Sequence, residues 1–527
     1  MTKTRYDIVI AGGGHNGLVV GCYLAKAMLK VCVIEKNDVV GGGVVTREVT
    51  VPGFKHDLAS VVHGALMANP MIHRDELELM SKYGLKYIWP DPQLAILFPD
   101  DRALVFYRDI HKTCESIAQF SQRDAENYPK YIERATEVLK MGGAVFYSPP
   151  PTFGAMVSLM DSSEMGREYL RVVMSSAHDI AEEWFESDQM KIAISRWASE
   201  MMVGPVENGT GAYAFGIPHI HRWGMAYPEG GSGMLSEALA ACLRDKGGEV
   251  MLSSSIKAIK VEGEEAKGVI LDSGEEILAD KAVISNLNAK QLFLDMLGPE
   301  LLPEGFQGKI KRLKASTFQG MLQALALNEA PRYKAGGDVN KAGMVEISPF
   351  LEDYLRTFDE FRYGIPSAIM PMMVVATLFD STRAPQGRHT MYLYHYEPYD
   401  LKDGGAAKWD AIRQEVADGI LETLRKYTTN MGPENILGRW MHTPLDYERT
   451  NPAFIHGDIG QIGPQITQFF GNRPLPGWGK YRTPVKKLYM CGSSTHPGGA
   501  VTGGGRAAVQ VVMEDLGIDF RKVIAKQ

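Results

Sequence analysis

The chain opens with a short apolar run, a glycine-rich turn, a helical pattern and a second apolar run. Residues 8–11 (IVIA) have the continuous apolar character of a parallel strand that is buried on both faces. A helical pattern begins near Asn16, and residues 30–35 (KVCVIE) predict a second strand. This order predicts a strand, a tight turn, a helix and a parallel strand, which is how an α/β sheet begins.

A second block of strand and helix patterns lies between residues 227 and 289. Residues 234–246 have helical apolar spacing, and Gly247 and Gly248 end that pattern as a helix C-cap does. Short strands are then predicted at residues 249–252, 256–261, 268–271 and 276–278, with a further apolar run at 280–285. This block predicts that the segment of residues 227–289, far from the N-terminus in sequence, completes the first sheet.

The intervening residues, 91–226 and 290–457, contain neither repeats nor low-complexity runs. Helical spacing is clear at residues 109–142 and 408–429, and strand alternation at residues 316–328, 367–379 and 389–398. These patterns predict a helical cap over an antiparallel sheet, which forms one face of a cavity.

The turn after the first strand carries the pattern G-x-G-x-x-G at Gly12, Gly14 and Gly17. In a dinucleotide-binding unit the first glycine permits the turn, and the second lets a pyrophosphate approach the backbone. The third lets the helix pack on the strand. Backbone amides at the start of the helix, near Asn16, would face the phosphates with the helix dipole in support.

Two features after this turn select among dinucleotides. Glu35 ends the second strand about 20 residues after the loop, where a carboxylate accepts both ribose hydroxyls and disfavours the 2′-phosphate of NADP. A second glycine cluster follows at Gly41, Gly42 and Gly43. A long FAD, covered from a second side, needs backbone room there, whereas a nicotinamide dinucleotide does not. The sequence therefore predicts FAD, and Ile256 lies where the chain would cross the adenine.

Five stretches together resemble the phytoene desaturase family of flavoproteins, within the wider amine-oxidase-like group. They are DIVIAGGGHNGLVVGCYLAK (7–26), VPGFKHDLAS (51–60), YPEGGSGMLSEAL (227–239), ADKAVISN (279–286) and LYMCGSSTHPGGAVTGGGRAA (488–508). The motifs keep the family's order along the whole chain, and the nearest branch is the phytoene dehydrogenase-related or carotene-ketolase-like one. Relatives often carry Arg or Ala after the glycine doublet, where this chain has Gly43 and Val44. A side-chain contact to the pyrophosphate from that position is therefore lost.

The resemblance implies that the C-terminal glycine-rich stretch forms the far side of the FAD site. Leu488 begins the last strand, and a helix from about Gly505 points its N-terminus at the pyrimidine side of the flavin. Both ends of the chain then hold one cofactor. The residues expected to hold FAD are Gly12, Gly14, His15, Asn16, Gly17, Glu35, Lys36, Gly41, Gly42, Gly43, Val44, Ile256, Gly492, Ser493, Ala500, Val501 and Thr502.

The expected fold class is α/β, with a Rossmann-type FAD-binding domain and a second, discontinuous α+β substrate domain. We assign residues 1–90, 227–289 and 458–527 to the FAD-binding domain, and residues 91–226 and 290–457 to the substrate-binding cap. The length of 527 residues supports more than one domain.

Composition narrows the function classes. A formal net charge of −7 argues against nucleic-acid binding. The five cysteines are odd in number and contain no C-x-x-C pair, which argues against a disulfide scaffold, a zinc site or a thioredoxin-like dithiol. Without a signal-peptide pattern or an apolar run long enough to span a bilayer, we expect a soluble, cytoplasmic protein. The uncharged, loop-like stretch at residues 141–160 leaves peripheral membrane contact open.

No Ser/His/Asp or paired-carboxylate constellation stands out, which is consistent with flavin chemistry. His63 and His496 are weak catalytic candidates and are more typical of structural histidines. His219 and His221 share a strand face if that segment is extended, and with Met321 they are weak substrate-binding candidates. No third ligand at suitable spacing supports a metal site. The abundant methionines suit an adaptable apolar pocket, although core filling explains any single one of them.

Three functional hypotheses stay open. The first, for which the resemblance supplies the reaction class, is an FAD-dependent desaturase of a largely apolar substrate, reoxidised by oxygen, a quinone or another carrier. The second is an FAD oxidase acting on a C–N or C–O bond of a small polar substrate. The third is a flavin-binding partner protein with little turnover. Neither the substrate nor the oligomeric state follows from the sequence.

Overall fold

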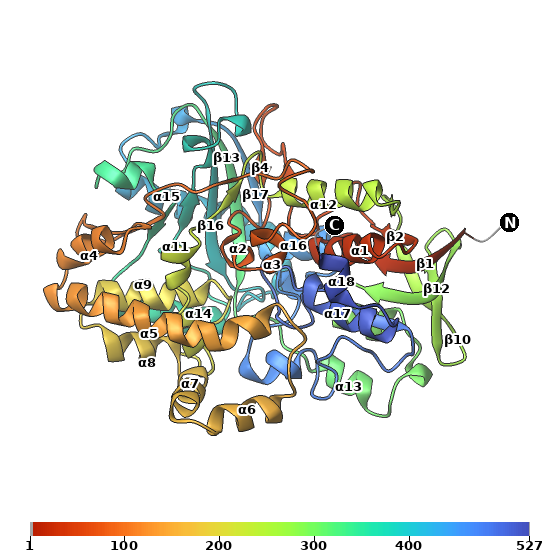
Figure 1. The fold of residues 1–527 in the computed structure, drawn as a ribbon. Coiled ribbons are helices and arrows are strands. Elements are labelled where there is room, and N and C mark those ends of the chain that lie inside the picture. Colours follow the sequence, from red (N-terminus) through yellow and green to blue (C-terminus); the bar gives the residue numbers. More distant parts are fainter. Residues whose placement is uncertain (1–3, 526–527) are drawn as a thin grey trace.

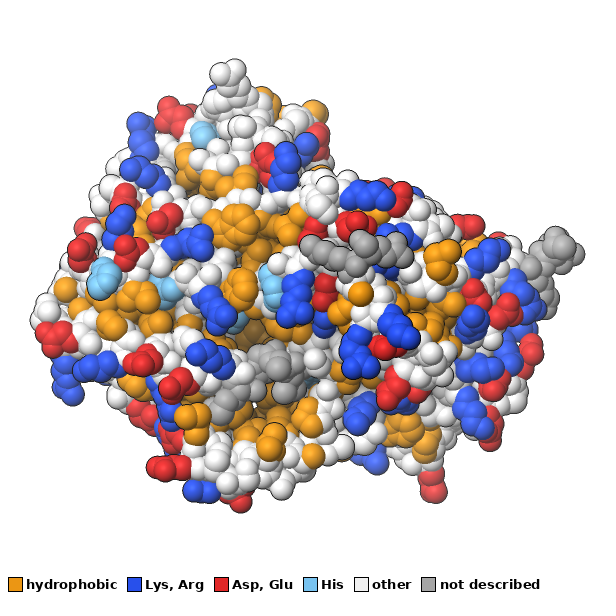
Figure 2. Space-filling view, in the orientation of Figure 1, with side chains coloured by type: hydrophobic (Ala, Val, Ile, Leu, Met, Phe, Trp, Pro, Cys, Tyr) orange, Lys and Arg blue, Asp and Glu red, His pale blue; other side chains and the backbone are white. Residues whose placement is uncertain are grey.

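The computed structural model describes residues 4–525, apart from the side chains of residues 141–145. Two seven-stranded sheets and two short two-stranded ribbons organise the chain. Figure 1 shows the strands of the first sheet on the right and those of the second at the upper left. Figure 2 shows charged side chains spread over this face, with apolar side chains grouped in patches between them.

The first sheet collects strands from the beginning, the middle and the end of the chain. Its order is β10-β11-β12-β1-β2-β9, and β18 also pairs with β12. Neighbours among β1, β2, β9, β12 and β18 are parallel, and β10 and β11 extend the sheet in antiparallel fashion. The strands are β1 Thr4–Ala11, β2 Val31–Ile34, β9 Glu249–Met251, β10 Ile256–Glu262, β11 Glu265–Leu271, β12 Glu276–Ser285 and β18 Leu488–Met490.

One strand of this sheet is longer than the sequence predicts. The alternating stretch at 276–278 and the apolar run at 280–285 belong to one continuous strand, β12. The charged side chains inside it are paired across the sheet, since Asp280 bonds to Arg5 and Lys281 lies 3.3 Å from Asp7. These pairs satisfy the charges without a break in the strand.

Three helices pack around β1 and β2: α1 (His15–Lys26), α12 (Gly233–Asp245) and α17 (Gly505–Asp515). Helix α1 contacts both of the others, so the N-terminal and C-terminal glycine-rich segments lie side by side (Figure 1). The short helix α18 (Phe520–Ile524) follows α17.

The second sheet has the order β17-β13-β16-β15-β14-β6-β7 and is antiparallel except between β14 and β6. Its strands are β6 Leu94–Leu97, β7 Ala103–Phe106, β13 Gln319–Leu327, β14 Met344–Ile347, β15 Met372–Val374, β16 His389–Glu397 and β17 Ile436–His442. The strand pattern predicted at 367–379 is realised only in β15, because a 3₁₀ turn at Ala376–Leu378 follows it.

The faces of the second sheet are both buried. One face packs on α15 (Trp409–Tyr427), in a core that includes Met321, Leu325 and Leu393. The opposite face belongs to a core shared with the helical layer. The helices of that layer are α4 Ile110–Ala118, α5 Gln122–Phe146, α6 Phe153–Asp161, α7 Glu164–Met174, α8 Ala177–Trp184, α9 Asp188–Ser199, α10 Gly211–Ala214, α11 Pro218–Arg222 and α14 Leu351–Arg362.

Two local predictions in this layer are wrong. Residues 141–160 are not loop-like, because α5 continues to Phe146 and the Thr152 side chain caps α6 by accepting from the amide of Ala155. Residues 218–222 form α11 rather than a strand, because Pro218 occupies the first turn, where its missing N–H does no harm.

The remaining α-helices and strands lie outside the two large sheets. They are the ribbon of β3 (Thr46–Arg47) and β4 (His56–Asp57), the ribbon of β5 (Tyr87–Ile88) and β8 (Tyr227–Pro228), and the helices α2 (Gly64–Met67), α3 (Pro70–His73), α13 (Phe306–Lys311) and α16 (Pro444–Thr450). The predicted fold class is confirmed: a parallel α/β sheet is joined to a mostly antiparallel sheet with a helical layer. Within the described residues, no helix is both long and apolar enough to cross a membrane.

Candidate active site

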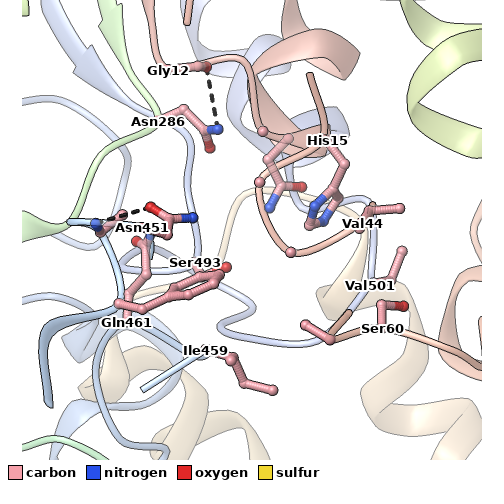
Figure 3. Close-up of a pocket in the computed structure, with 18 of the residues that line it drawn as sticks. Gly12, His15, Val44, Ser60, Asn286, Asn451, Ile459, Gln461, Ser493 and Val501 are labelled. Atoms are coloured by element: carbon pink, nitrogen blue, oxygen red, sulfur yellow. Dashed lines mark hydrogen bonds between the residues drawn. The ribbon is translucent and has the colours of Figure 1, made fainter. Parts of the chain in front are cut away.

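A cavity of about 270 Å³ is lined by residues of both sheets and of the loops between them (Figure 3). Most of the residues predicted to hold the cofactor line it: Gly12, Gly14, His15, Asn16, Glu35, Lys36, Gly41, Gly42, Gly43, Val44, Ile256, Ser493, Ala500 and Val501. The second sheet and its helices line the rest. We call the part lined by the two glycine loops and Glu35 the dinucleotide half, and the part lined by the second sheet and its helices the substrate half.

The first glycine loop leaves no room for side chains. Gly12 has φ of +95°, which a glycine adopts without strain, and its amide donates to the Ile34 carbonyl at 2.8 Å. A Cβ on Gly14 would lie 2.6 Å from the Asn286 amide nitrogen. Gly14 also precedes α1 without any side-chain cap, so the first amides of the helix are free of such an acceptor. This geometry suits a phosphate at the start of α1.

Glu35 sits at the end of β2 in a fixed orientation. One carboxylate oxygen accepts from the Gly13 amide at 2.8 Å and the other from the Asn37 amide at 2.9 Å. Burial raises the pKa of Glu35, while these two backbone hydrogen bonds oppose that shift. The side chain is thus held at the cavity wall, as a ribose acceptor must be.

The second glycine cluster lies directly against the first loop. The Gly41 amide donates to the Gly13 carbonyl at 2.9 Å, and Gly14 and Gly41 form an isolated parallel bridge. Gly41 and Gly42 have φ of +121° and +63°. Most other residues would be strained at these backbone angles. The two loops together form a bare backbone surface along the cavity.

The C-terminal segment closes the same cavity and is tied to α1. The side-chain oxygen of Asn16 accepts from the Gly505 amide at 3.0 Å, so the N-terminal helix caps the last long helix. The Asn69 side chain donates to the Thr502 carbonyl at 2.9 Å. These bonds fix the loop that carries Ala500 and Val501.

A buried arginine holds the same loop from behind. Arg473 is 1% exposed and donates to the Ser493 carbonyl at 2.9 Å from Nε. Its other donors reach further backbone carbonyls, those of Gly460, Ile462, Gly463 and Gln468. Burial lowers its pKa to about 10. Sequence patterns did not indicate this residue, because an arginine that binds only carbonyls has no fixed motif.

Several buried polar atoms at the cavity lack a hydrogen-bond partner among the described residues. His15 Nε2, Ser60 Oγ and Gln291 Oε1 belong to lining residues, and Thr502 Oγ1 follows the lining residue Val501. An unsatisfied buried polar atom costs roughly 1–3 kcal/mol. A ligand with phosphate, hydroxyl and heterocyclic polar groups would satisfy such atoms, and FAD carries all three kinds. The residues present therefore fit FAD.

Three of the residues predicted to hold FAD are not among the residues that line the cavity. Gly17 and Gly492 are needed for backbone packing, since a Cβ on either would clash with the backbone of Gly12 or Asn286. Thr502 holds the C-terminal loop through its carbonyl.

The substrate half is apolar and aromatic. Met344, Met372, Tyr392 and Tyr394 project from one face of the second sheet, and Met202 follows helix α9. The two tyrosine rings stack at 5.6 Å between centroids with an interplanar angle of 16°. Phe454 and Ile459 complete this half from the loops after α16.

Met321 faces away from the cavity, contrary to the sequence-based assignment. It lies on β13 in the core that packs on α15, whereas its neighbour Leu322 belongs to the core on the cavity side. Side chains alternate along a strand, so a one-residue difference moves a methionine to the opposite face.

The four histidines considered for catalysis or substrate binding, His63, His219, His221 and His496, do not line the cavity either. His221 contacts the Tyr128 hydroxyl at 2.8 Å and the Arg108 carbonyl at 3.1 Å, and His219 is buried on the same helix. His63 contacts Tyr87 and Ser232, and burial lowers its pKa to about 3. His496 is buried beside Phe146. A catalytic or substrate-binding role for any of them is a prediction that this geometry does not favour.

Glu200 is a lining residue that sequence reasoning missed. It follows Ser199 at the C-terminus of α9, and its Oε1 accepts a hydrogen bond from the Tyr396 hydroxyl. Burial and the nearby Glu346 raise its pKa to about 7. A single Glu within RWASEMM carries no motif, so only the fold brings it to the cavity. Within the described residues, no group of three or more His, Cys, Asp or Glu is arranged to hold a metal.

Comparison with known proteins places these features in a family. The model of the family described as "Flavin containing amine oxidoreductase" matches residues 17–321. The chain is 30% identical to rat "Pyridine nucleotide-disulfide oxidoreductase domain-containing protein 2", covering 98% of this chain and 94% of that protein. It is 28% identical to a limonene dehydrogenase component of Castellaniella defragrans, covering 98% and 95% of the two chains.

More distant similarities are consistent with this family and fold. Phytoene desaturase (lycopene-forming) of Pantoea ananas is 23% identical, with coverage of 96% of this chain and 99% of that one. A solved oxidoreductase from Methanosarcina mazei has a TM-score of 0.62 at 17% identity, covering 97% and 100% of the chains. Cyclohexylamine oxidase from Brevibacterium oxydans has a TM-score of 0.59 at 16% identity, covering 97% and 99%; both structures share the fold. The predicted carotene-ketolase-like branch has no support among these relatives.

Proposed function

The chain belongs to the flavin containing amine oxidoreductase family and is an FAD-dependent oxidoreductase, and on this premise we propose that it dehydrogenates a largely apolar organic substrate. When bound, FAD supplies the two-electron chemistry, since its isoalloxazine ring accepts a hydride. The protein supplies binding, orientation and the exclusion of water.

The proposed cofactor contacts follow the cavity wall. The amides at the start of α1 and the two glycine loops would hold the pyrophosphate, and Glu35 would accept the adenosine ribose hydroxyls. The loop through Ser493, Ala500 and Val501 would contact the flavin end of the cofactor.

The observation that carries the proposed substrate class is the lining of the substrate half. Met202, Met344, Met372, Phe454 and Ile459 offer apolar surface without a hydrogen-bonding side chain. Flexible thioethers adapt to the shape of a hydrocarbon, and such a lining excludes water. Two relatives are named for the hydrocarbons limonene and phytoene, which supports this proposal.

A second candidate function is oxidation of a C–N or C–O bond in a small polar substrate. Glu200 and the stacked pair Tyr392 and Tyr394 favour it, because a carboxylate and aromatic faces bind organic cations. The apolar residues outnumber the single carboxyl group in this half, so we rank this function second. For either function we propose oxygen, a quinone or another carrier as the electron acceptor.

Anaerobic reduction of the flavin distinguishes the two functions. The FAD-loaded protein is mixed with limonene, with phytoene in detergent micelles, and with cyclohexylamine or putrescine, while the visible absorbance of oxidised flavin is followed. We expect saturable bleaching by at least one hydrocarbon and none by the amines. Bleaching by amines alone would replace the first proposal with the second.

A further inference from the structure

Glu200 is the carboxyl group of the substrate half of the cavity. It is partly exposed to the cavity although it lies deep in the fold, between α9 and the second sheet. Tyr396 donates to its Oε1, and among the described residues no hydrogen bond occupies Oε2. One oxygen is therefore held while the other is free to meet a ligand.

The charges around Glu200 do not neutralise it. Arg196, one helical turn earlier, lies 2.8 Å from Glu346 through Nε, and its other nitrogens donate to the carbonyls of Ile347 and Met370. Arg196 is thus paired with Glu346, and its charge stabilises the Glu200 carboxylate only in part. The titratable and charged groups that face Glu200 are Arg196 on α9, Glu346 on β14, Tyr354 on α14, and Tyr392, Tyr394 and Tyr396 on β16.

This environment makes Glu200 able to exchange a proton near neutrality. Burial and the negative charge of Glu346 raise its pKa to about 7, and Tyr396 and Arg196 oppose that shift. Its place after the C-terminus of α9 also disfavours the carboxylate through the helix dipole. A group with such a pKa is suited to accept a proton and later release it.

Other groups at the cavity are poor proton acceptors. Glu35 lies in the dinucleotide half, and backbone amides occupy both of its oxygens. Burial lowers the pKa of His15 to about 4, which makes it a weak base. Tyr392 and Tyr394 are neutral phenols, because burial raises their pKa values well above the ordinary one.

We propose that Glu200 is the proton acceptor of the dehydrogenation, taking the substrate proton on Oε2 while Tyr396 holds Oε1. The proposal rests on the proposed function. Forming one C=C bond removes a hydride from one carbon and a proton from its neighbour. The bonding pair of the C–H that loses the proton becomes the π bond. Bound FAD would supply the acceptor for the hydride and its electron pair, and Glu200 would hold the proton until solvent receives it.

The test compares wild type with Glu200→Gln, which keeps the shape and cannot accept the proton, and with Tyr396→Phe. Anaerobic flavin bleaching by limonene or phytoene is measured against pH, together with FAD content and the Kd of the same hydrocarbon from the flavin spectral shift. In wild type the rate constant should rise with pH, with its midpoint near the Glu200 pKa of about 7. Glu200→Gln should slow bleaching by about 100-fold or more and remove that pH step, with FAD content and Kd unchanged.

Tyr396→Phe should move the midpoint of the pH profile upwards, because the hydrogen bond from Tyr396 stabilises the carboxylate. Glu186→Gln is the matched control, since Glu186 is an exposed carboxylate bonded to Ser121 and Arg123 outside the cavity lining. That control should keep both the rate and the pH profile. Equal rates and profiles for Glu200→Gln and wild type would overturn the proposal.

Failure of the Glu200 proposal can be distinguished from failure of the proposed hydrocarbon dehydrogenation. If only amines bleach the flavin, the hydrocarbon proposal fails, and the same variants still test Glu200, because oxidation of an amine also releases a proton. Infrared difference spectra of the FAD-loaded protein need no substrate. A carboxylic acid band that titrates near neutral pH and is absent from Glu200→Gln supports the proposal, and its absence from wild type overturns it.

Discussion

The dinucleotide half of the cavity is defined at the residue scale by positions where no side chain can be added. Gly12 and Gly41 need glycine for their backbone angles, with φ of +95° and +121°. Gly14 has an ordinary backbone angle and needs glycine for space, because a Cβ would lie 2.6 Å from the side-chain nitrogen of Asn286. The same residue type thus meets two physical requirements in two neighbouring loops.

Replacing Gly14 by Val should yield protein without FAD or with a poorly formed first domain. The branched side chain would enter the space between Asn286 and the expected pyrophosphate position. The ratio of flavin to protein absorbance, with circular dichroism, measures the effect. Gly154→Val is the control, because no atom lies within 4 Å of a Cβ at that exposed position in α6. Full flavin content in Gly14→Val would show that this loop does not hold the phosphates.

Glu35→Ala should be milder. The variant loses the expected acceptor for the ribose hydroxyls and also frees the Gly13 and Asn37 amides. We expect FAD binding to weaken by roughly 1–3 kcal/mol, as for hydrogen bonds to a charged group. Titration of the apoprotein with FAD, followed by flavin fluorescence, gives the Kd. An unchanged Kd would remove Glu35 from the site.

At the residue scale, the sequence indicated cavity-lining residues where a motif fixes the backbone, and it missed those that only the fold brings together. Gly12, Gly14 and Glu35 were identifiable because their spacing follows from a strand, a turn and a helix. Glu200 and Arg473 were not identifiable. Glu200 bonds to Tyr396, more than a hundred residues away, and Arg473 bonds to Ser493, about twenty residues away. No local pattern specifies either pairing. Whether each predicted residue contacts FAD is still a prediction.

At the scale of elements, the substrate half depends on how two neighbouring strands of the second sheet match. Gly320 on β13 pairs with Tyr396 on β16, and the Tyr394 ring lies across the Gly320 backbone, where a Cβ would collide with its hydroxyl end. A glycine in a strand interior thus makes room for an aromatic ring. The sequence predicted both strands correctly, but the face that meets the cavity follows from register.

Gly320→Val should displace Tyr394 and destabilise the protein by about 1–3 kcal/mol, as overpacking does, while FAD stays bound. Thermal unfolding and flavin content measure the two effects. The double variant Gly320→Val with Tyr394→Ala should recover part of the loss, since the collision is then removed. Strictly additive losses would show that the ring and the glycine are independent.

At the scale of the whole molecule, helices α1 and α17, from the two ends of the chain, are joined through a buried ion pair. Arg506 on α17 donates through two nitrogens to Glu76, at 2.7 Å each, and Tyr23 on α1 donates to the same carboxylate at 2.6 Å. The sequence predicted that both ends meet, from the second glycine-rich segment. It did not predict this pair, because nothing in the sequence links Glu76 to either motif.

Arg506→Met should destabilise the protein by roughly 3–5 kcal/mol, because Glu76 would keep a buried charge without its partner. Burial alone would raise the pKa of Glu76, but the hydrogen bonds from Arg506 and Tyr23 outweigh it and lower that pKa. A lowered folded-state pKa contributes stability above the unfolded value of 4.5 and loses it as the pH falls. Wild type should therefore lose stability below that pH, measured by urea unfolding. The double variant Glu76→Gln with Arg506→Met should be more stable than Arg506→Met alone.

The arrangement of the whole chain also predicts where electrons enter. A reductase that passes electrons from NAD(P)H to a disulfide needs a second nucleotide site beside the flavin and a thiol pair that can reach it. The chain has one strand-bound G-x-G-x-x-G, and none of its five cysteines is among the residues that line the cavity. Cys22 and Cys242 are buried between α1 and α12, and burial raises the pKa of Cys22 and Cys491.

We therefore expect NADH and NADPH, mixed anaerobically with the oxidised protein, to bleach the flavin slowly or not at all. Flavin reduced by light should be reoxidised by oxygen or a quinone analogue. Rapid, saturable bleaching by either nucleotide would reveal a nicotinamide site and replace the dehydrogenase proposal with a reductase.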